Sequence, residues 1–92
     1  FKKYYIDGFK APFVKESKIR YALELEEIVP IRQNRTFLVI GAITSVFLDS
    51  LLIDKDGFIN IDQANSITSL GLDGYYKVEK IDRLPYAKVA TD

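Results

Sequence analysis

The sequence contains neither cysteine nor histidine. Without cysteine, the chain can form no disulfide bond, no thiolate nucleophile and no cysteine-ligated metal site. Without histidine, it lacks the commonest general base and the commonest zinc ligand. A Ser-His-Asp triad is therefore excluded.

The chain also lacks an excess of charge of either sign. Thirteen Lys and Arg residues balance thirteen Asp and Glu residues. Since there is no basic field, binding to nucleic acid or to an anionic membrane is disfavoured. The longest apolar run, Phe37 to Val46, is broken by Gly41, Thr44 and Ser45 and is too short to span a bilayer. No signal-peptide pattern is visible, so we expect a cytoplasmic location.

The length bounds the organisation of the chain. Its 92 residues, 48% apolar and 28% charged, are typical of one globular domain, so we predict a single domain over residues 1–92. A domain of this size buries only about 60–65% of its unfolded surface, which leaves little stability to spare. The sequence starts at Phe1 and not at Met, and we therefore expect a fragment or a processed product.

Two long strands dominate the predicted structure. Apolar and polar residues alternate from Ile19 to Val29, which is typical of a strand with one buried face. The phase breaks at Glu26-Glu27, where we predict a β-bulge, and Pro30 is expected to end the pairing. Leu23 and Leu25 are expected to face the core.

The second strand is predicted over Phe37 to Leu48, after a short polar connection with Gln33 and Asn34 at its tip. The start of this strand is apolar on both faces, which indicates packing on both sides. Gly41 within it marks a bend or a close approach of another group. Two long strands joined by a short connection predict an antiparallel hairpin.

The segment Asp54-Lys55-Asp56-Gly57 is expected to be a turn that mimics part of an EF-hand calcium loop. If Gly57 takes the sixth loop position, Leu52 falls at the first and Gln63 at the twelfth, and neither supplies the carboxylate needed there. We therefore predict a plain hairpin turn and no metal site.

Three glutamates, Glu24, Glu26 and Glu27, raise the question of paired carboxylates for acid–base chemistry. Glu24 and Glu26 fall on the polar face of the predicted strand, whereas a catalytic pair needs a cleft. A solvated face is the favoured interpretation, and no catalytic residue is assigned.

The best candidate binding segment is the loop that runs from Gly71 to Tyr76. Gly71 and Gly74 permit positive φ angles and a close approach of the backbone to a flat ligand. Tyr75, with its neighbour Tyr76, offers an aromatic face and a hydroxyl group. The alternative left open is that these tyrosines cover the edge of a core.

Several short motifs, in this order, resemble the C-terminal half of the flavin reductase-like, FMN-binding split-barrel family. They are Glu27-Ile28-Val29-Pro30-Ile31, Phe37-Leu38-Val39-Ile40-Gly41, Leu51-Leu52-Ile53-Asp54-Lys55-Asp56-Gly57, Gly71-Leu72-Asp73-Gly74-Tyr75 and Arg83-Leu84-Pro85-Tyr86-Ala87-Lys88. The resemblance extends over the stretch from Leu23 to Lys88, about two-thirds of the chain.

The resemblance implies a mostly β chain forming part of an antiparallel split barrel, with short helical turns. It implies FMN or FAD as cofactor, NAD(P)H as a possible electron donor, and Gly71, Gly74 and Tyr75 as cofactor-binding residues. The family's phosphate-binding residues lie mostly in its first half, which has no counterpart here. A homodimer, a missing N-terminal segment or a partner chain is therefore expected. The open alternative is a non-catalytic β module that binds a protein through its strand edges.

Overall fold

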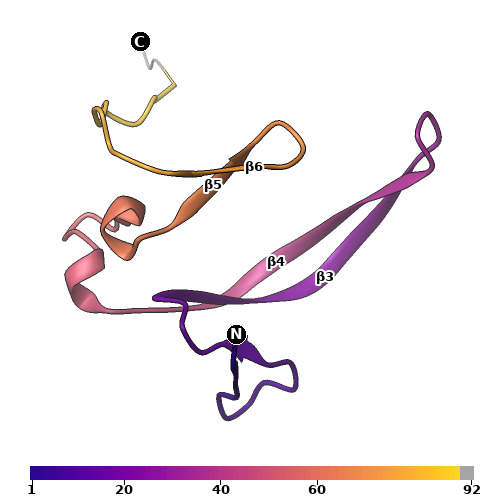
Figure 1. Cartoon of the computed structure of the whole chain (residues 1–92), viewed down its shortest axis with the longest axis horizontal. Coiled ribbons are helices and arrows are strands. Elements are labelled where there is room, and N and C mark those ends of the chain that lie inside the picture. The colour runs from indigo at the N-terminus through magenta and orange to yellow at the C-terminus, as the bar shows by residue number, and fades with distance from the viewer. Residues whose placement is uncertain (90–92) are drawn as a thin grey trace.

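The computed structural model describes residues 1–89 and shows a chain whose regular structure is mostly antiparallel β (Figure 1). Its elements are the strands β1 (Lys3–Tyr4), β2 (Phe13–Val14), β3 (Ile19–Ile31) and β4 (Thr36–Leu48), the 3₁₀ turns η1 (Ser50–Leu52) and η2 (Ile61–Ala64), and the strands β5 (Ile67–Leu70) and β6 (Gly74–Lys77). The predicted fold class, mostly β with short helical turns, is confirmed.

The predicted hairpin is present as β3 and β4, which pair antiparallel from Ile19↔Leu48 to Ile31↔Thr36. The register shifts between Leu25 and Glu27, so the bulge expected at the doubled glutamates is confirmed. A second shift, which the sequence did not suggest, lies between Ala22 and Leu23. At this second shift the Thr44 hydroxyl donates a hydrogen bond to the Ala22 carbonyl, 3.3 Å away.

The prediction that Pro30 ends the pairing was wrong. Pro30 stays in register with Phe37, and β3 continues to Ile31. The sheet has only two strands, so β3 has an unpaired edge. Proline is tolerated on such an edge because its missing N–H need not serve a neighbouring strand.

The N-terminal segment folds against the base of the long hairpin. Strands β1 and β2 pair antiparallel, and the rings of Phe9, Phe13 and Phe47 meet edge to face with centroids 5.7–5.8 Å apart. Such aromatic pairs contribute roughly 0.5–1.5 kcal/mol each beyond their area burial. This trio joins the N-terminal hairpin to the end of β4.

The second half of the chain is a compact turn region followed by a short hairpin. The turn expected at Asp54–Gly57 is present, with Gly57 N–H donating to the Asp54 carbonyl at 3.0 Å and an isolated bridge between Ile53 and Ile59. Strands β5 and β6 then pair from Ile67↔Lys77 to Leu70↔Gly74. Among residues 1–89, no helix is long and apolar enough to cross a membrane.

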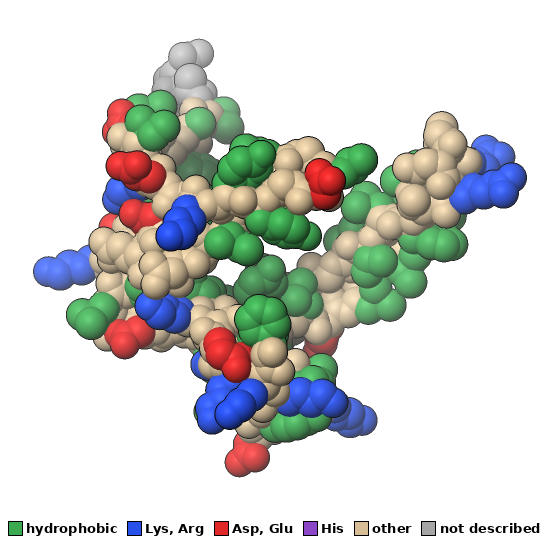
Figure 2. Space-filling view, in the orientation of Figure 1, with side chains coloured by type: hydrophobic (Ala, Val, Ile, Leu, Met, Phe, Trp, Pro, Cys, Tyr) green, Lys and Arg blue, Asp and Glu red, His purple; other side chains and the backbone are tan. Residues whose placement is uncertain are grey.

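The β3–β4 and β5–β6 hairpins extend separately, with open space between them (Figures 1 and 2). The radius of gyration is 16.9 Å, against about 12 Å expected for a compact domain of this length. The accessible surface is 8924 Å², against roughly 5,400 Å² expected from the mass. Among the described residues, only Leu52, Ala64 and Asn60 are less than 9% exposed.

The expectation that Leu23 and Leu25 face a core is not met within this chain. Leu23 is 52% exposed and Leu25 is 64% exposed. Their strand has the predicted alternation, but within residues 1–89 no second layer covers the β3–β4 hairpin beyond its base, and Figure 2 shows apolar side chains exposed along it.

Candidate functional site

The glycine-tyrosine segment is the tip and second strand of the β5–β6 hairpin and not an irregular loop. Gly71 opens the turn after β5, and Gly74, Tyr75 and Tyr76 belong to β6. The three predicted site residues, Gly71, Gly74 and Tyr75, therefore lie within one hairpin, with Gly74 opposite Leu70 and Tyr75 opposite Ser69.

The two glycines of this hairpin are required for different structural reasons. Gly71 has a φ of +73°, and a Cβ there would meet no atom within 4 Å. It is therefore the backbone angle, and not crowding, that favours glycine at this turn. At Gly74 it is crowding that favours glycine, because a Cβ there would lie 2.9 Å from the Tyr76 ring and 3.1 Å from the Leu70 carbonyl oxygen.

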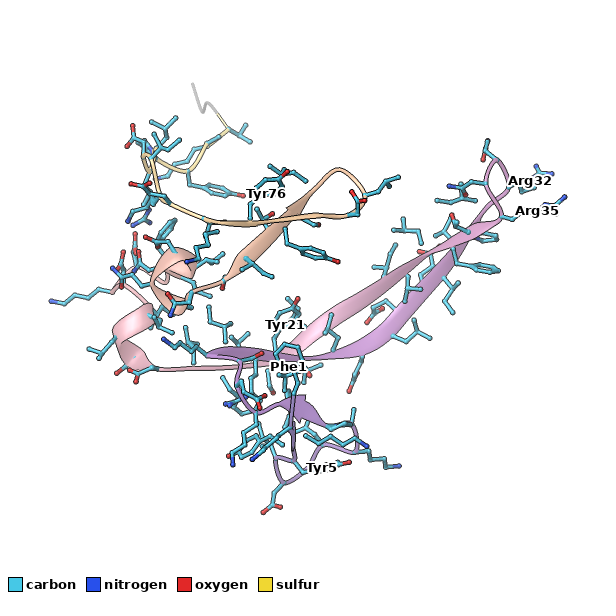
Figure 3. The ribbon with its side chains drawn as sticks, viewed as in Figure 1. Phe1, Tyr5, Tyr21, Arg32, Arg35 and Tyr76 are labelled. Atoms are coloured by element: carbon cyan, nitrogen blue, oxygen red, sulfur yellow. The ribbon has the colours of Figure 1, made fainter. Side chains whose placement is uncertain are left out.

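The two tyrosines of β6 have different surroundings. Successive side chains of a strand point to opposite faces, so Tyr76 shares a face with Gly74 and Tyr75 lies on the other. Tyr76 covers Gly74, and Figure 3 shows it along β6. Tyr75 is 72% exposed. Tyr76 is 50% exposed, so Tyr75 is the more accessible of the two rings to a ligand.

Cavities are found away from the tip of this hairpin. One of about 680 Å³ lies between the segment that precedes β3 and the end of β4, and it is lined by residues that include Lys15, Lys18, Arg20, Phe47, Asp49 and Gln63. A second, of about 270 Å³, is mostly apolar and lies between the Phe58–Asp62 segment and residues 78–80. Neither cavity includes Gly71, Gly74 or Tyr75 in its lining.

Glu24, Glu26 and Glu27 are all exposed on the β3–β4 hairpin. Glu26 is the bulge residue, which leaves it without a partner in the register of β4. The solvated-face interpretation agrees with this placement, and nothing in the hairpin forms a cleft around the three carboxylates.

The carboxylates of the Asp54–Gly57 turn are engaged by protein groups. Arg83 forms an ion pair with Asp56 and another with Asp54, the latter at 3.6 Å, and its guanidinium lies 3.9 Å from the centroid of the Phe58 ring. The buried Asn60 amide donates to Asp54 at 2.9 Å. Within residues 1–89, no three acidic, cysteine or histidine side chains gather where they could hold a metal ion.

The Arg83 guanidinium lowers the pKa of Asp56, mainly through its hydrogen bond to the carboxylate, and the Phe58 N–H lowers it further. Arg83 and Asn60 were not singled out from the sequence. The sequence feature that could have indicated a partner such as Arg83 is the closely spaced pair Asp54 and Asp56. Two neighbouring carboxylates without a metal ion favour a charge-assisted contact with an arginine or lysine side chain.

The solved structures supply one match of direct relevance. The chain is 41% identical to a crystallised protein of Shewanella frigidimarina NCIMB 400, provisionally assigned as a flavin reductase with a split barrel domain. The TM-score is 0.86, and the match covers 94% of this chain and 43% of that protein. No family model matches the chain, and no curated protein does so either.

The resemblance to a flavin reductase-like split-barrel protein is therefore confirmed. The chain spans less than half the length of its structural neighbour, which is consistent with a C-terminal half. The likeness extends over nearly the whole chain, well beyond the two-thirds on which the motifs rest.

Proposed function

We propose that this chain is the C-terminal part of a flavin-binding oxidoreductase that transfers a hydride from NAD(P)H to FMN or FAD once the barrel is complete. The observation that carries the proposal is the 41% identity, at a TM-score of 0.86, to a protein provisionally assigned as a flavin reductase. Flavin-related function follows from that likeness, whereas the donor and the choice of flavin are part of the proposal.

The β5–β6 hairpin is the part of this chain that we propose for cofactor binding. Tyr75 presents an exposed ring suited to contact with a flat, amphipathic isoalloxazine. The backbone at Gly71 is open to solvent because no side chain covers it. Gly74 contributes indirectly, since it gives Tyr76 the space to lie along the strand.

The flavin, when bound, supplies the hydride-accepting chemistry, so this chain needs no histidine base. The role proposed for its residues is to position the ring and to exclude water beside it. No catalytic residue is assigned within the described part of the chain.

The exposed surface supports a contribution from outside this chain. The accessible surface exceeds the value expected for a compact domain by about 3,500 Å². A standard protein–protein interface covers only about 800 Å² on each partner. A missing N-terminal segment therefore accounts for the excess better than a homodimer contact alone, and a homodimer of the completed barrel stays part of the proposal, as does a cytoplasmic location.

The test is a flavin titration, followed by fluorescence quenching, on the complete polypeptide that contains this chain. Tyr75→Ala should weaken FMN affinity roughly threefold to tenfold, because it removes an aromatic contact of about 0.5–1.5 kcal/mol beyond area burial. The matched control is Tyr5→Ala, an exposed tyrosine in the N-terminal segment, far from β6 in Figure 3. Equal affinity in all three proteins, with folding confirmed by circular dichroism, would remove Tyr75 from the site.

A second candidate is a non-catalytic β module that binds a protein partner through strand edges. Each of the three sheets in residues 1–89 has only two strands, so every strand has one edge free. Flavin absorbance in the purified complete protein discriminates the two, because the binding module predicts a colourless preparation that does not take up added FMN.

A further inference from the structure

Two arginines flank the turn at the far end of the β3–β4 hairpin. Arg32 follows β3, Arg35 precedes β4, and both are exposed. Ile31 and Thr36 form the last pair of the hairpin, so Arg32 and Arg35 are the first and last residues of the turn that connects the two strands. Figure 3 labels both arginines at the tip of the hairpin, where Figure 2 shows blue side chains that project away from the rest of the molecule.

Neither guanidinium forms an ion pair with another side chain among residues 1–89, where Arg83 is the residue that does so. The nearest acidic residues along β3 are Glu26 and Glu27. Arg32 lies five residue steps along the chain from Glu27, which is about 17 Å in an extended strand. Two exposed cations on one short turn repel each other, and an anion bound by both would relieve that repulsion.

The tip is held in one conformation. The Asn34 side-chain oxygen accepts hydrogen bonds from the Thr36 N–H at 3.2 Å and from the Thr36 hydroxyl at 2.5 Å. Arg35 has a φ of +56°, in the left-handed region that glycine or asparagine adopts more easily. The chain thus places a large cation at a position where its backbone is strained.

We propose that Arg32 and Arg35 together bind a phosphate group of a nucleotide at the tip of the hairpin. Guanidinium groups present several N–H donors in a fixed fork that matches phosphate oxygens. Two of them on a fixed turn can each donate to the same phosphate, and they require no contribution from the β5–β6 hairpin. The choice of FMN and NADPH as candidate sources of that phosphate rests on the proposed function.

The ligand chemistry is a phosphate monoester, and two sources fit it, namely the 5′-phosphate of FMN and the 2′-phosphate of NADPH. The experiment is calorimetric titration of the complete polypeptide at low ionic strength, with FMN against riboflavin and with adenosine 2′-monophosphate against adenosine. The pair that loses affinity without its phosphate identifies the source.

The double variant Arg32→Gln/Arg35→Gln should bind the preferred phosphate ester on the order of tenfold more weakly or worse, because two charge-assisted contacts are lost. Affinity for riboflavin or adenosine should not change. Lys55→Gln, which neutralises an exposed cation at another turn, should leave both unchanged. Arg35→Gly should lose affinity while raising the melting temperature, since it relieves the backbone strain.

Equal phosphate affinity in the wild type and in the double variant would overturn the proposal. It would also be overturned if the double variant changed only the oligomeric state, because the tip would then contact an acidic protein surface. Unchanged riboflavin affinity in Tyr75→Ala, with phosphate discrimination intact, would count against the proposed role of Tyr75 alone, so the two proposals fail separately.

Discussion

At the scale of single residues, Gly74 and Tyr76 form one packing unit. A Cβ at position 74 would come within 2.9 Å of the Tyr76 ring, closer than real Cβ contacts are found. Gly74→Ala should therefore destabilise the protein by about 1–3 kcal/mol through overpacking. In a Tyr76→Ala background, most of that cost should disappear, because the ring that causes it is gone.

A double-mutant cycle of urea unfolding on the complete polypeptide measures this coupling. If Gly74→Ala costs the same free energy of unfolding in the wild type and in the Tyr76→Ala background, the Tyr76 ring moves aside freely. The result also bears on the cofactor site, because a loss of flavin affinity in Gly74→Ala would act through the Tyr76 ring and not through direct contact with the glycine.

The pair Asp56 and Arg83 leads to a pH-dependent prediction. The folded-state pKa of Asp56 lies below its usual 3.8 because Arg83 donates to its carboxylate. The stabilisation by this pair is present above the unfolded pKa and is lost as the pH falls through the folded pKa. Arg83→Gln should raise the pKa of Asp56 towards its usual value.

The measurement is an NMR titration of the Asp56 carboxyl carbon between pH 2 and 6, with Lys55→Gln as the control for a simple loss of charge at the turn. An unchanged midpoint in Arg83→Gln would show that the ion pair does not persist in solution. A shift of the same size in both variants would assign the effect to net charge and not to contact.

At the scale of elements, the sequence was informative where its pattern was long. Eleven residues of near-strict alternation predicted β3, and the adjacent glutamates at 26 and 27 revealed a bulge because they break that alternation. The second bulge is not visible in the sequence, since Ala22 and Thr44 fit either face of a strand.

The β5–β6 hairpin was missed for a related reason. Its strands are four residues each and contain Ser, Thr and Gly, so neither reaches the length at which alternation is distinguishable from a loop. The sequence singled out this segment as a candidate site, but it did not predict the geometry of the segment. The hydrogen bonds between Ile67–Leu70 and Gly74–Lys77, which fix it, depend on pairing that neither segment signals alone.

The exposure of β3 changes the cost expected for truncating Leu23. If Leu23 keeps its 52% exposure in the complete polypeptide, Leu23→Ala should cost only about 1 kcal/mol, roughly half of the transfer energy of a buried leucine. If the rest of the barrel covers this face, the same change in the complete polypeptide should cost about 2–5 kcal/mol.

Chemical unfolding of the complete polypeptide measures which of the two costs applies. Leu72→Ala, at the fully exposed tip of the β5–β6 hairpin, is the matched control and should be near neutral. A cost of only about 1 kcal/mol for Leu23→Ala would show that nothing outside this chain packs on that part of β3.

At the scale of the whole molecule, the chain has well-defined secondary-structure elements but hardly any hydrophobic core. Within residues 1–89 the buried apolar residues are Leu52 and Ala64, and the rings of Phe9, Phe13 and Phe47 form an aromatic cluster. Two-stranded hairpins without a packed face are marginally stable in water. The 43% coverage of the structural neighbour fits this picture, since more than half of that protein lies outside the match.

The isolated chain of residues 1–92 is therefore expected not to persist as a compact monomer. Its apolar hairpin faces and free strand edges should drive self-association or leave the chain expanded. Small-angle scattering combined with sedimentation tests this directly, with the complete polypeptide as reference. A stable 10.5 kDa monomer with a radius of gyration near 12 Å, the value for a compact domain of this length, would contradict the expectation. Such a monomer would have to close its two hairpins onto each other, and the surface that we assign to the rest of the barrel would then be satisfied within this chain.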